Sequence, residues 1–228
     1  MSGARDRKDV EAEPPAQKTW VFDLDNTLYP AECNLFAQID RKMSAFVAGL
    51  FDVDHLEARR IQKRYFLDYG TTLKGLMDRH GVDPHAFLAE VHDIDISAIE
   101  PDPALSEALE GLKGRKLVFT NASAGYAEKI LNRLGIARHI DGLYDIVAAG
   151  FEPKPRAETY ARFVERHQVA PTRAVMIEDM ARNLLPAAEL GMTTVWLRTR
   201  YEWGRVGHDP AGVHHEIDNL VAFLRAPS

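Results

Sequence analysis

The chain has 228 residues, of which 46% are hydrophobic and 27% are charged, and its formal net charge is −6. These values are ordinary for a soluble globular protein of one domain or two small ones, and they do not indicate binding to nucleic acid polymers or to an anionic membrane. Its single cysteine, Cys33, excludes an internal disulfide framework and any cysteine-rich zinc site, and it fits a cytoplasmic location.

Residues 1–17 are charged and contain proline but lack the apolar stretch of a signal peptide, so we expect a disordered N-terminal tail. No segment approaches the roughly 20 apolar residues that a membrane-spanning helix needs. Residues 18–23 predict a short buried strand, because Trp20, Val21 and Phe22 are aromatic or β-branched.

The next part of the chain, from residue 34 to about residue 92, predicts helices and no strand. Apolar residues recur at helical spacing over 35–50, and further helices are predicted over 54–69, over 73–80 and from 84 onward. A break in the helical pattern falls at Gly70.

From residue 100 onward, predicted strands alternate with helices. Strands are expected over 116–120, 143–148, 174–177 and 193–197, helices over 104–112, 123–134, 155–167, 181–190 and 218–224, and a loop over 199–215. This alternation predicts a doubly wound, Rossmann-like parallel sheet of the α/β class, covered by helices on both faces. Right-handed crossovers place the carboxyl ends of the strands along one edge.

Polar residues follow four of these strands. They are Asp23 and Asp25 after the first, Thr120 and Asn121 after the second, Lys154 in the loop after the third, and Glu178 and Asp179 after the fourth. Taken singly, each also fits an ordinary structural role. The acids are typical of a strand end, Thr120 and Asn121 of a helix cap, and Lys154 of a surface charge. Their expected convergence at one edge predicts a magnesium-dependent phosphatase with Asp23 as the nucleophile.

These segments also carry a family resemblance. Asp23-Leu-Asp25-Asn-Thr27, Thr120-Asn121, Lys154-Pro155 and Glu178-Asp179-Met-Ala-Arg-Asn183 resemble the four ordered motifs of the haloacid dehalogenase superfamily. The resemblance implies a core of residues 18–32 and 100–228 and a small all-helical cap, residues 33–99, inserted after the first strand. Segments 65–76, 93–95 and 99–103 look like the pyrimidine 5′-nucleotidase branch. Arg156 departs from the family pattern, which often has a second proline-spaced polar residue after the Lys-Pro pair.

The resemblance implies Mg²⁺ as cofactor and different roles for the two acids of the first motif. Asp23 would bind the metal and form an aspartyl-phosphate, which divides the hydrolysis into two steps. Asp25 would protonate the leaving group and then deprotonate water, while its main-chain carbonyl binds the metal. Asp179 would supply the second carboxylate, and Glu178 would act through water or by positioning a ligand.

The remaining implied roles concern the phosphate. Thr120, the Asn121 backbone and Leu24 would hold its oxygens, and Lys154 would neutralise its charge and orient Asp23. Thr27 and Asn183 would support the site. For Asn183 the alternative, an early helix residue with no partner, remains open.

The break at Gly70 has two interpretations. Within the family such breaks face the active site, which predicts substrate contacts from Tyr69, Thr71 and Thr72. An ordinary turn between two helices is the alternative, and the sequence leaves both open.

The expected substrate is a small phosphate ester, namely a nucleoside 5′-monophosphate of the pyrimidine (UMP or CMP) type. Alternatives are another small ester such as a sugar phosphate or phosphoglycolate, a phosphomutase reaction, and a non-catalytic binding protein on this scaffold. A dehalogenase needs no acid two positions after the nucleophile, so Asp25 argues against that activity. The sequence predicts no oligomeric state.

Overall fold

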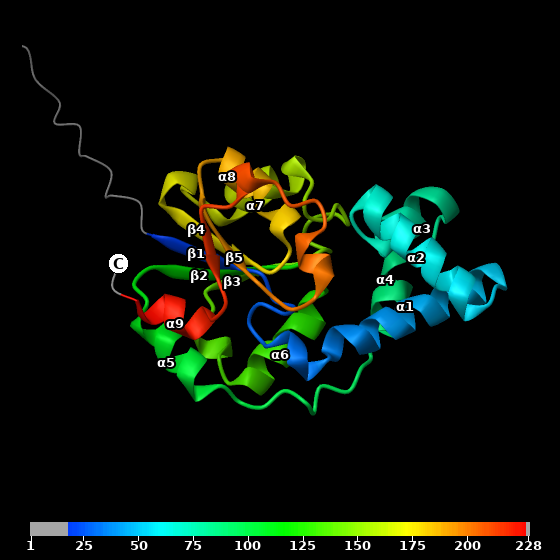
Figure 1. Cartoon of the computed structure of the whole chain (residues 1–228), viewed down its shortest axis with the longest axis horizontal. Coiled ribbons are helices and arrows are strands. Elements are labelled where there is room, and N and C mark those ends of the chain that lie inside the picture. Colours follow the sequence, from blue (N-terminus) through cyan, green and yellow to red (C-terminus); the bar gives the residue numbers. More distant parts are fainter. Residues whose placement is uncertain (1–17, 227–228) are drawn as a thin grey trace, which may run out of the picture.

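A computed structural model describes residues 18–226, and the tail predicted over residues 1–17 lies outside the described residues (Figure 1). A six-stranded sheet forms the centre, with the order β3-β2-β1-β4-β5-β6 and every neighbouring pair parallel. The strands are β1 (Thr19–Phe22), β2 (Arg115–Phe119), β3 (Gly142–Tyr144), β4 (Ala174–Glu178), β5 (Thr193–Leu197) and β6 (His215–Ile217).

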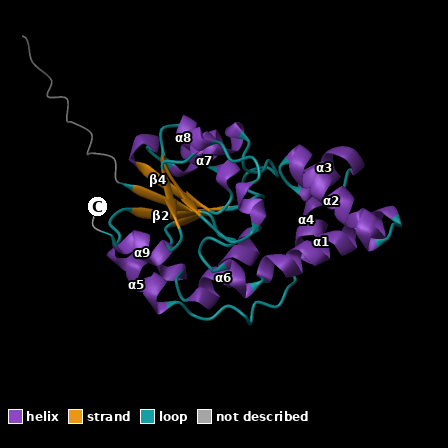
Figure 2. Ribbon diagram, in the orientation of Figure 1, coloured by secondary structure: helices purple, strands orange, loops and turns teal. Residues whose placement is uncertain are grey.

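Helices cover both faces of this sheet (Figures 1 and 2). One face carries α5 (Pro103–Gly111), α6 (Ala124–Leu134) and α9 (Leu220–Arg225), and the other carries α7 (Ala157–His167) and α8 (Leu185–Glu189). Successive strand residues point to opposite faces, so Trp20 and Phe22 join the core under α5 and α6, whereas Val21 joins the core under α7. The predicted doubly wound parallel sheet is confirmed.

The first four α-helices after β1 lie together beside the sheet (Figure 1). We call this segment, residues 35–91, the helical insertion. The four helices are α1 (Leu35–Phe51), α2 (His55–Tyr69), α3 (Thr72–His80) and α4 (Pro84–Val91). Side-chain oxygens cap three of them, because Asp54, Thr71 and Asp83 accept hydrogen bonds from main-chain N–H groups of α2, α3 and α4. The expectation of helices without strands here is confirmed. Among residues 18–226, no helix combines the length and apolar character needed to cross a bilayer.

Two sequence predictions were wrong in the second half of the chain. The strand predicted over 143–148 ends at Tyr144, because the Asp145 carboxylate accepts hydrogen bonds from the N–H groups of Ala148 and Ala124, both at 2.8 Å, and turns the chain. The predicted loop over 199–215 contains two short 3₁₀ helices and leads into β6, which pairs with β5. This edge strand has only three residues and one aliphatic side chain, Ile217, so it gave no apolar pattern.

Candidate active site

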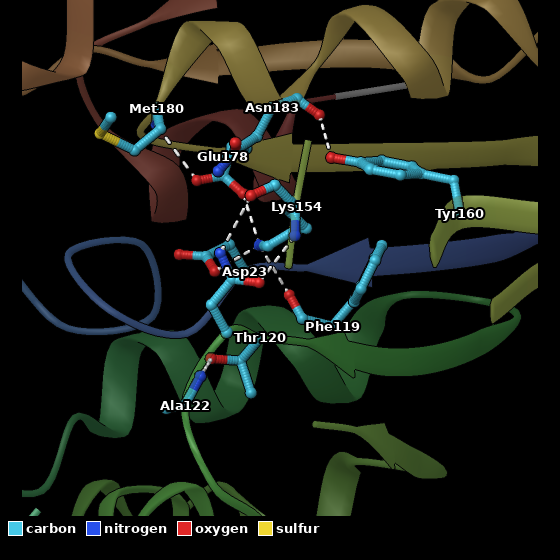
Figure 3. A network of polar contacts seen from close by, with 10 residues as sticks. Asp23, Phe119, Thr120, Ala122, Lys154, Tyr160, Glu178, Met180 and Asn183 are labelled. Atoms are coloured by element: carbon cyan, nitrogen blue, oxygen red, sulfur yellow. Dashed lines mark hydrogen bonds and ion pairs between the residues drawn. The ribbon is translucent and has the colours of Figure 1, made fainter. Parts of the chain in front are cut away.

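The predicted polar residues meet where the sheet order reverses around β1. Strands β2 and β4 flank β1, and Asp23 continues from β1 with its N–H donating to the Ile177 carbonyl at 2.9 Å. Figure 3 shows Asp23, Lys154 and Glu178 pointing toward one another, with Thr120 beside them. Open α/β sheets bind ligands in the crevice at this point of topological reversal.

Lys154 lies at the centre of the network. Its side chain is 1% exposed, and Nζ donates to Asp23 Oδ1 at 2.7 Å, to Glu178 Oε2 at 2.6 Å and to the Phe119 carbonyl at 2.8 Å. These three bonds use all three ammonium protons and fix the lysine rigidly. Burial opposes its positive charge, but Asp23 and Glu178 outweigh burial and raise the pKa of Lys154.

Three buried carboxylates lie together at this site, and Lys154 contacts two of them, Asp23 and Glu178. Asp23, Glu178 and Asp179 each offer an oxygen atom, and these atoms lie within 4.8 Å of one another. Burial and then repulsion from Glu178 raise the pKa of Asp23 to about 7 despite the opposing effect of Lys154. Burial and repulsion from Glu178 and Asp23 also raise the pKa of Asp179. Ionisation of all three acids would therefore leave an excess of buried negative charge, which is the environment of a divalent-cation site.

The roles of Glu178 and Asn183 differ from those of the other polar residues. Both oxygens of Glu178 are engaged, because Oε1 accepts from the Met180 N–H at 3.1 Å while Oε2 binds Lys154. Asn183 is 5% exposed and its Oδ1 has no hydrogen-bond partner among the described residues. Its main-chain carbonyl accepts the Tyr160 hydroxyl, which ties this loop to α7. Asn183 is among the residues that line the cleft, and its support of the site stays a prediction.

Thr120 and Asn121 follow β2. Thr120 Oγ1 accepts from the Ala122 N–H at 3.0 Å, which leaves its own hydroxyl proton free to donate. The Asn121 side chain clamps the main chain of Lys154, accepting from its N–H at 2.9 Å and donating to its carbonyl at 3.3 Å. The sequence suggested a role for the Asn121 backbone but gave no signal for this side-chain clamp.

Asp25 lies beside two tyrosines that the sequence analysis did not identify. Its Oδ1 accepts from the Tyr29 hydroxyl at 2.5 Å and from the Tyr126 hydroxyl at 3.0 Å. Burial raises the pKa of Asp25, and the two tyrosine hydrogen bonds oppose this shift. Tyr29 lies only four residues after Asp25, so its position next to the first motif could have indicated it. Tyr126 is 101 residues away from Asp25, and no local sequence pattern points to it.

A cleft of about 350 Å³ separates this edge of the sheet from the helical insertion. The insertion lines it mainly with apolar side chains, namely those of Phe36, Met43, Phe66, Phe87, Leu88 and Val91. Trp203, from the predicted loop to which no function was assigned, also lines the cleft and meets Phe66 edge-on at 6.0 Å. The Arg182 guanidinium lies 4.1 Å from the Phe66 ring centre and donates to the Gly70 carbonyl at 3.0 Å, which joins the core to the insertion.

The residues predicted around Gly70 are not equivalent. Thr71 and Thr72 line the cleft, but Thr71 Oγ1 caps α3 by accepting from the Lys74 N–H at 3.1 Å, and Thr72 Oγ1 donates to the Gln62 carbonyl at 3.2 Å. Tyr69 is outside the cleft lining and packs edge-on against Tyr65.

Leu24 and Thr27 flank Asp25 in the chain, and both are buried. Leu24 is fully buried and is not among the residues that line the cleft, so its contact with a phosphate stays a prediction. Thr27 is 3% exposed, and its Oγ1 has no hydrogen-bond partner among residues 18–226.

Comparison with known proteins places this geometry in a family. A family model described as haloacid dehalogenase-like hydrolase matches residues 17–191. Phosphate metabolism protein 8 of Saccharomyces cerevisiae is 27% identical over 224 residues, which cover 91% of this chain but only 66% of the yeast protein.

Solved structures show the same fold. A HAD phosphatase from Thermococcus onnurineus aligns with a TM-score of 0.59 at 20% identity, covering 91% of this chain and 96% of that one. The L-2-haloacid dehalogenase from Xanthobacter autotrophicus aligns with a TM-score of 0.51 at 15% identity, covering 83% and 80%. The fold is therefore common to a phosphatase and a dehalogenase. Since the family model spans most of the sequence, the chain belongs to the haloacid dehalogenase-like hydrolase family.

Proposed function

We propose that this hydrolase is a magnesium-dependent phosphatase that cleaves phosphate monoesters through an aspartyl-phosphate on Asp23. The observation that carries the proposal is the contact of Lys154 Nζ with Asp23 and Glu178 at the edge of the cleft, with Asp25 two residues beyond the nucleophile. Phosphoryl transfer depends on positioning and charge stabilisation, and a rigidly held carboxylate beside an ammonium supplies both.

The donor set fits a divalent cation. Three carboxylate oxygens lie within 4.8 Å of one another, and burial together with repulsion between the acids raises the pKa values of Asp23 and Asp179. We propose that Asp23, Asp179 and the Asp25 main-chain carbonyl would hold Mg²⁺. Glu178 would act through water or through Lys154, because both of its oxygens already accept hydrogen bonds. When bound, the metal would reduce the repulsion between the phosphate and the attacking carboxylate.

The residues account for both steps of the reaction. An Asp23 oxygen forms a bond to phosphorus while the bond from phosphorus to the leaving oxygen breaks, and the proton of Asp25 passes to that oxygen. Water then attacks the phosphorus, Asp25 accepts a proton from it, and the bond to Asp23 breaks as phosphate leaves. The Thr120 hydroxyl donates a hydrogen bond to a phosphate oxygen and keeps its proton, while Lys154 holds Asp23 in place.

Asp25 favours a phosphatase over a dehalogenase on this common fold. A halide leaves without a proton, whereas an alkoxide needs one, and Asp25, which lines the cleft two residues after the nucleophile, can provide it. The name of the yeast relative, phosphate metabolism protein, agrees with this choice.

For the substrate we propose a nucleoside 5′-monophosphate of the pyrimidine type. The resemblance of segments 65–76, 93–95 and 99–103 supports this, and so do the aromatic rings of Phe66 and Trp203 in the cleft, which suit a planar base. Other small phosphate esters remain the alternative.

Phosphate release from UMP, CMP, purine nucleotides, sugar phosphates, phosphoglycolate and p-nitrophenyl phosphate, each with MgCl₂ and with EDTA, tests the proposal. We expect Mg²⁺-dependent release, fastest from UMP or CMP, and complete loss with every ester in a folded Asp23→Asn variant. Asp218→Asn, at a side chain that is 70% exposed, is the matched control and should keep wild-type activity.

Activity near wild type in Asp23→Asn would contradict the nucleophile assignment. An isomerised ester formed without phosphate release would indicate a phosphomutase, and release from sugar phosphates alone would overturn the substrate class.

A further inference from the structure

The strongest feature that the proposed reaction leaves unexplained is the pair of tyrosines at Asp25. Tyr29 and Tyr126 are 1% and 2% exposed, and their hydroxyl oxygens lie 3.3 Å apart. Both hydroxyls reach the same carboxylate oxygen, Asp25 Oδ1, at 2.5 Å and 3.0 Å. Burial raises the pKa of both tyrosines, so the hydroxyls stay protonated and donate.

Two donors on one oxygen determine where the other oxygen lies. Within the described chain no hydrogen bond is found to Asp25 Oδ2, and Asp25 lines the cleft. With Oδ1 held from two directions, the carboxyl group cannot rotate freely. Oδ2 is therefore the oxygen left to exchange a proton with a bound substrate.

His92, the residue directly after the helical insertion and the C-cap of α4, contributes to this arrangement. The His92 ring stacks on Tyr126 with centroids 4.6 Å apart and an interplanar angle of 17°. Its Nδ1 lies 2.9 Å from Ser123 Oγ, and Ser123 is the N-cap residue of α6, the helix that carries Tyr126. His92 thus contacts both the ring and the start of the helix.

We propose that Tyr29 and Tyr126 are positioning residues that present Asp25 Oδ2 to the leaving-group oxygen, and that His92, at the end of α4, holds Tyr126 in place. This inference rests on the proposed phosphatase function. In the first step the proton on Oδ2 moves to the leaving oxygen while the bond from phosphorus breaks, and in the second step Oδ2 takes a proton from water. The tyrosines keep their own protons throughout and touch no reacting atom.

The test compares two leaving groups in each variant. An alkoxide needs the proton of Asp25, whereas p-nitrophenolate is stable without it, so a misplaced Asp25 slows the alkyl ester selectively. The variants are Tyr29→Phe, Tyr126→Phe and His92→Ala, assayed with p-nitrophenyl phosphate and with the alkyl phosphate that wild type hydrolyses fastest. The measured quantity is kcat/KM, which covers the steps up to formation of the aspartyl-phosphate, so the second step, in which Asp25 serves both esters alike, does not enter it. The ratio of the two kcat/KM values is also independent of the folded fraction, because both assays use the same preparation.

We expect each Tyr→Phe change to lower kcat/KM for the alkyl ester about tenfold or more, while kcat/KM for p-nitrophenyl phosphate changes by less than about threefold. His92→Ala should give a smaller shift in the same direction, and His92→Phe, which retains a stacking ring, should restore most of it. Tyr144→Phe is the matched control, since no hydrogen bond to the Tyr144 hydroxyl is found within residues 18–226, and its ratio should equal that of wild type.

If Tyr126→Phe leaves the ratio of the two kcat/KM values unchanged, whether or not both values fall, the positioning role is overturned. That result is distinct from failure of the phosphatase proposal, in which wild type releases no phosphate or Asp23→Asn remains active.

Discussion

Two aspartates line the same cleft in opposite electrostatic surroundings. Asp23, at the sheet edge, shares one lysine with Glu178 and lies close to Asp179, and its pKa is raised to about 7. Asp40, in α1, accepts from Lys63 at 2.5 Å and from Arg59 at 2.7 Å. Burial opposes its charge, but these two cations prevail and lower the pKa of Asp40. In the insertion, one carboxylate is paired with two cations, whereas at the sheet edge two carboxylates share one cation.

This difference distinguishes an acid whose charge stabilises the fold, Asp40, from an acid whose charge is available for the proposed reaction, Asp23. An acid with a lowered pKa contributes to folding stability at neutral pH, while an acid with a raised pKa costs stability when it ionises. The ionised acids therefore cost folding stability at the sheet edge, where the proposed cation and phosphate would bind, whereas Asp40 in the insertion adds to it.

The largest expected effect is that of Lys154→Met. Removing a cation that is 1% exposed leaves Asp23 and Glu178 without their partner, which should cost about 3–5 kcal/mol of folding stability and abolish turnover. Urea denaturation and phosphate release measure both. Lys42→Met is the control, because its pair with Asp93 is solvent-exposed at 3.4 Å and is worth about 0–1 kcal/mol. Similar losses in both variants would remove the distinction between the two regions.

Metal binding should depend on pH in the direction set by the raised pKa values. Protons compete with the cation for Asp23 and Asp179, so Mg²⁺ should raise the Tm strongly at pH 8 and progressively less as pH falls below about 7. With Mg²⁺ at a hundredfold excess over Kd, the stabilisation at pH 8 is about 2.7 kcal/mol. Thermal melts with MgCl₂ and with EDTA at both pH values measure it.

Two results would contradict this prediction. A Tm shift of equal size at pH 5.5 and pH 8 would exclude proton competition at these acids, and an unchanged shift in Asp179→Asn would exclude Asp179 as a ligand.

The substitution of each aspartate by asparagine should shift stability in opposite directions. Asp40→Asn should destabilise the protein by about 1–2 kcal/mol at pH 7, because it loses charge-assisted bonds, and the deficit should shrink as pH falls below 3.8, where an unfolded Asp is protonated. Asp23→Asn, measured in EDTA, should raise Tm by several °C at pH 8 and less toward pH 4. The same sign for both changes at pH 8 would show that the two sites are not electrostatically different.

The sequence predicted the sheet edge better than the cleft. Asp23 and Thr120 directly follow β1 and β2, Glu178 ends β4, and Lys154 lies in the loop after β3, so the parallel topology brings these residues to one edge. Tyr126 and Trp203 reach the site through packing between segments far apart in the chain, for which periodicity gives no signal. Local rules also fail for short edge elements such as β6.

The smallest expected effect concerns Thr71, for which a turn and a substrate contact were both left open. Its hydroxyl oxygen caps α3 through the Lys74 N–H at 3.1 Å, so Thr71→Ala should cost about 1 kcal/mol of stability, while Thr71→Ser keeps the cap and should cost less. If the insertion serves mainly to shape the cleft, KM and kcat in Thr71→Ala should stay within about threefold of wild type, because a cap supports the helix and not the reacting atoms. Urea denaturation and steady-state kinetics on the best substrate decide this together. A rise in KM well above threefold, with Thr71→Ser restoring it, would instead place the hydroxyl in contact with substrate and assign part of the recognition to the turn at Gly70.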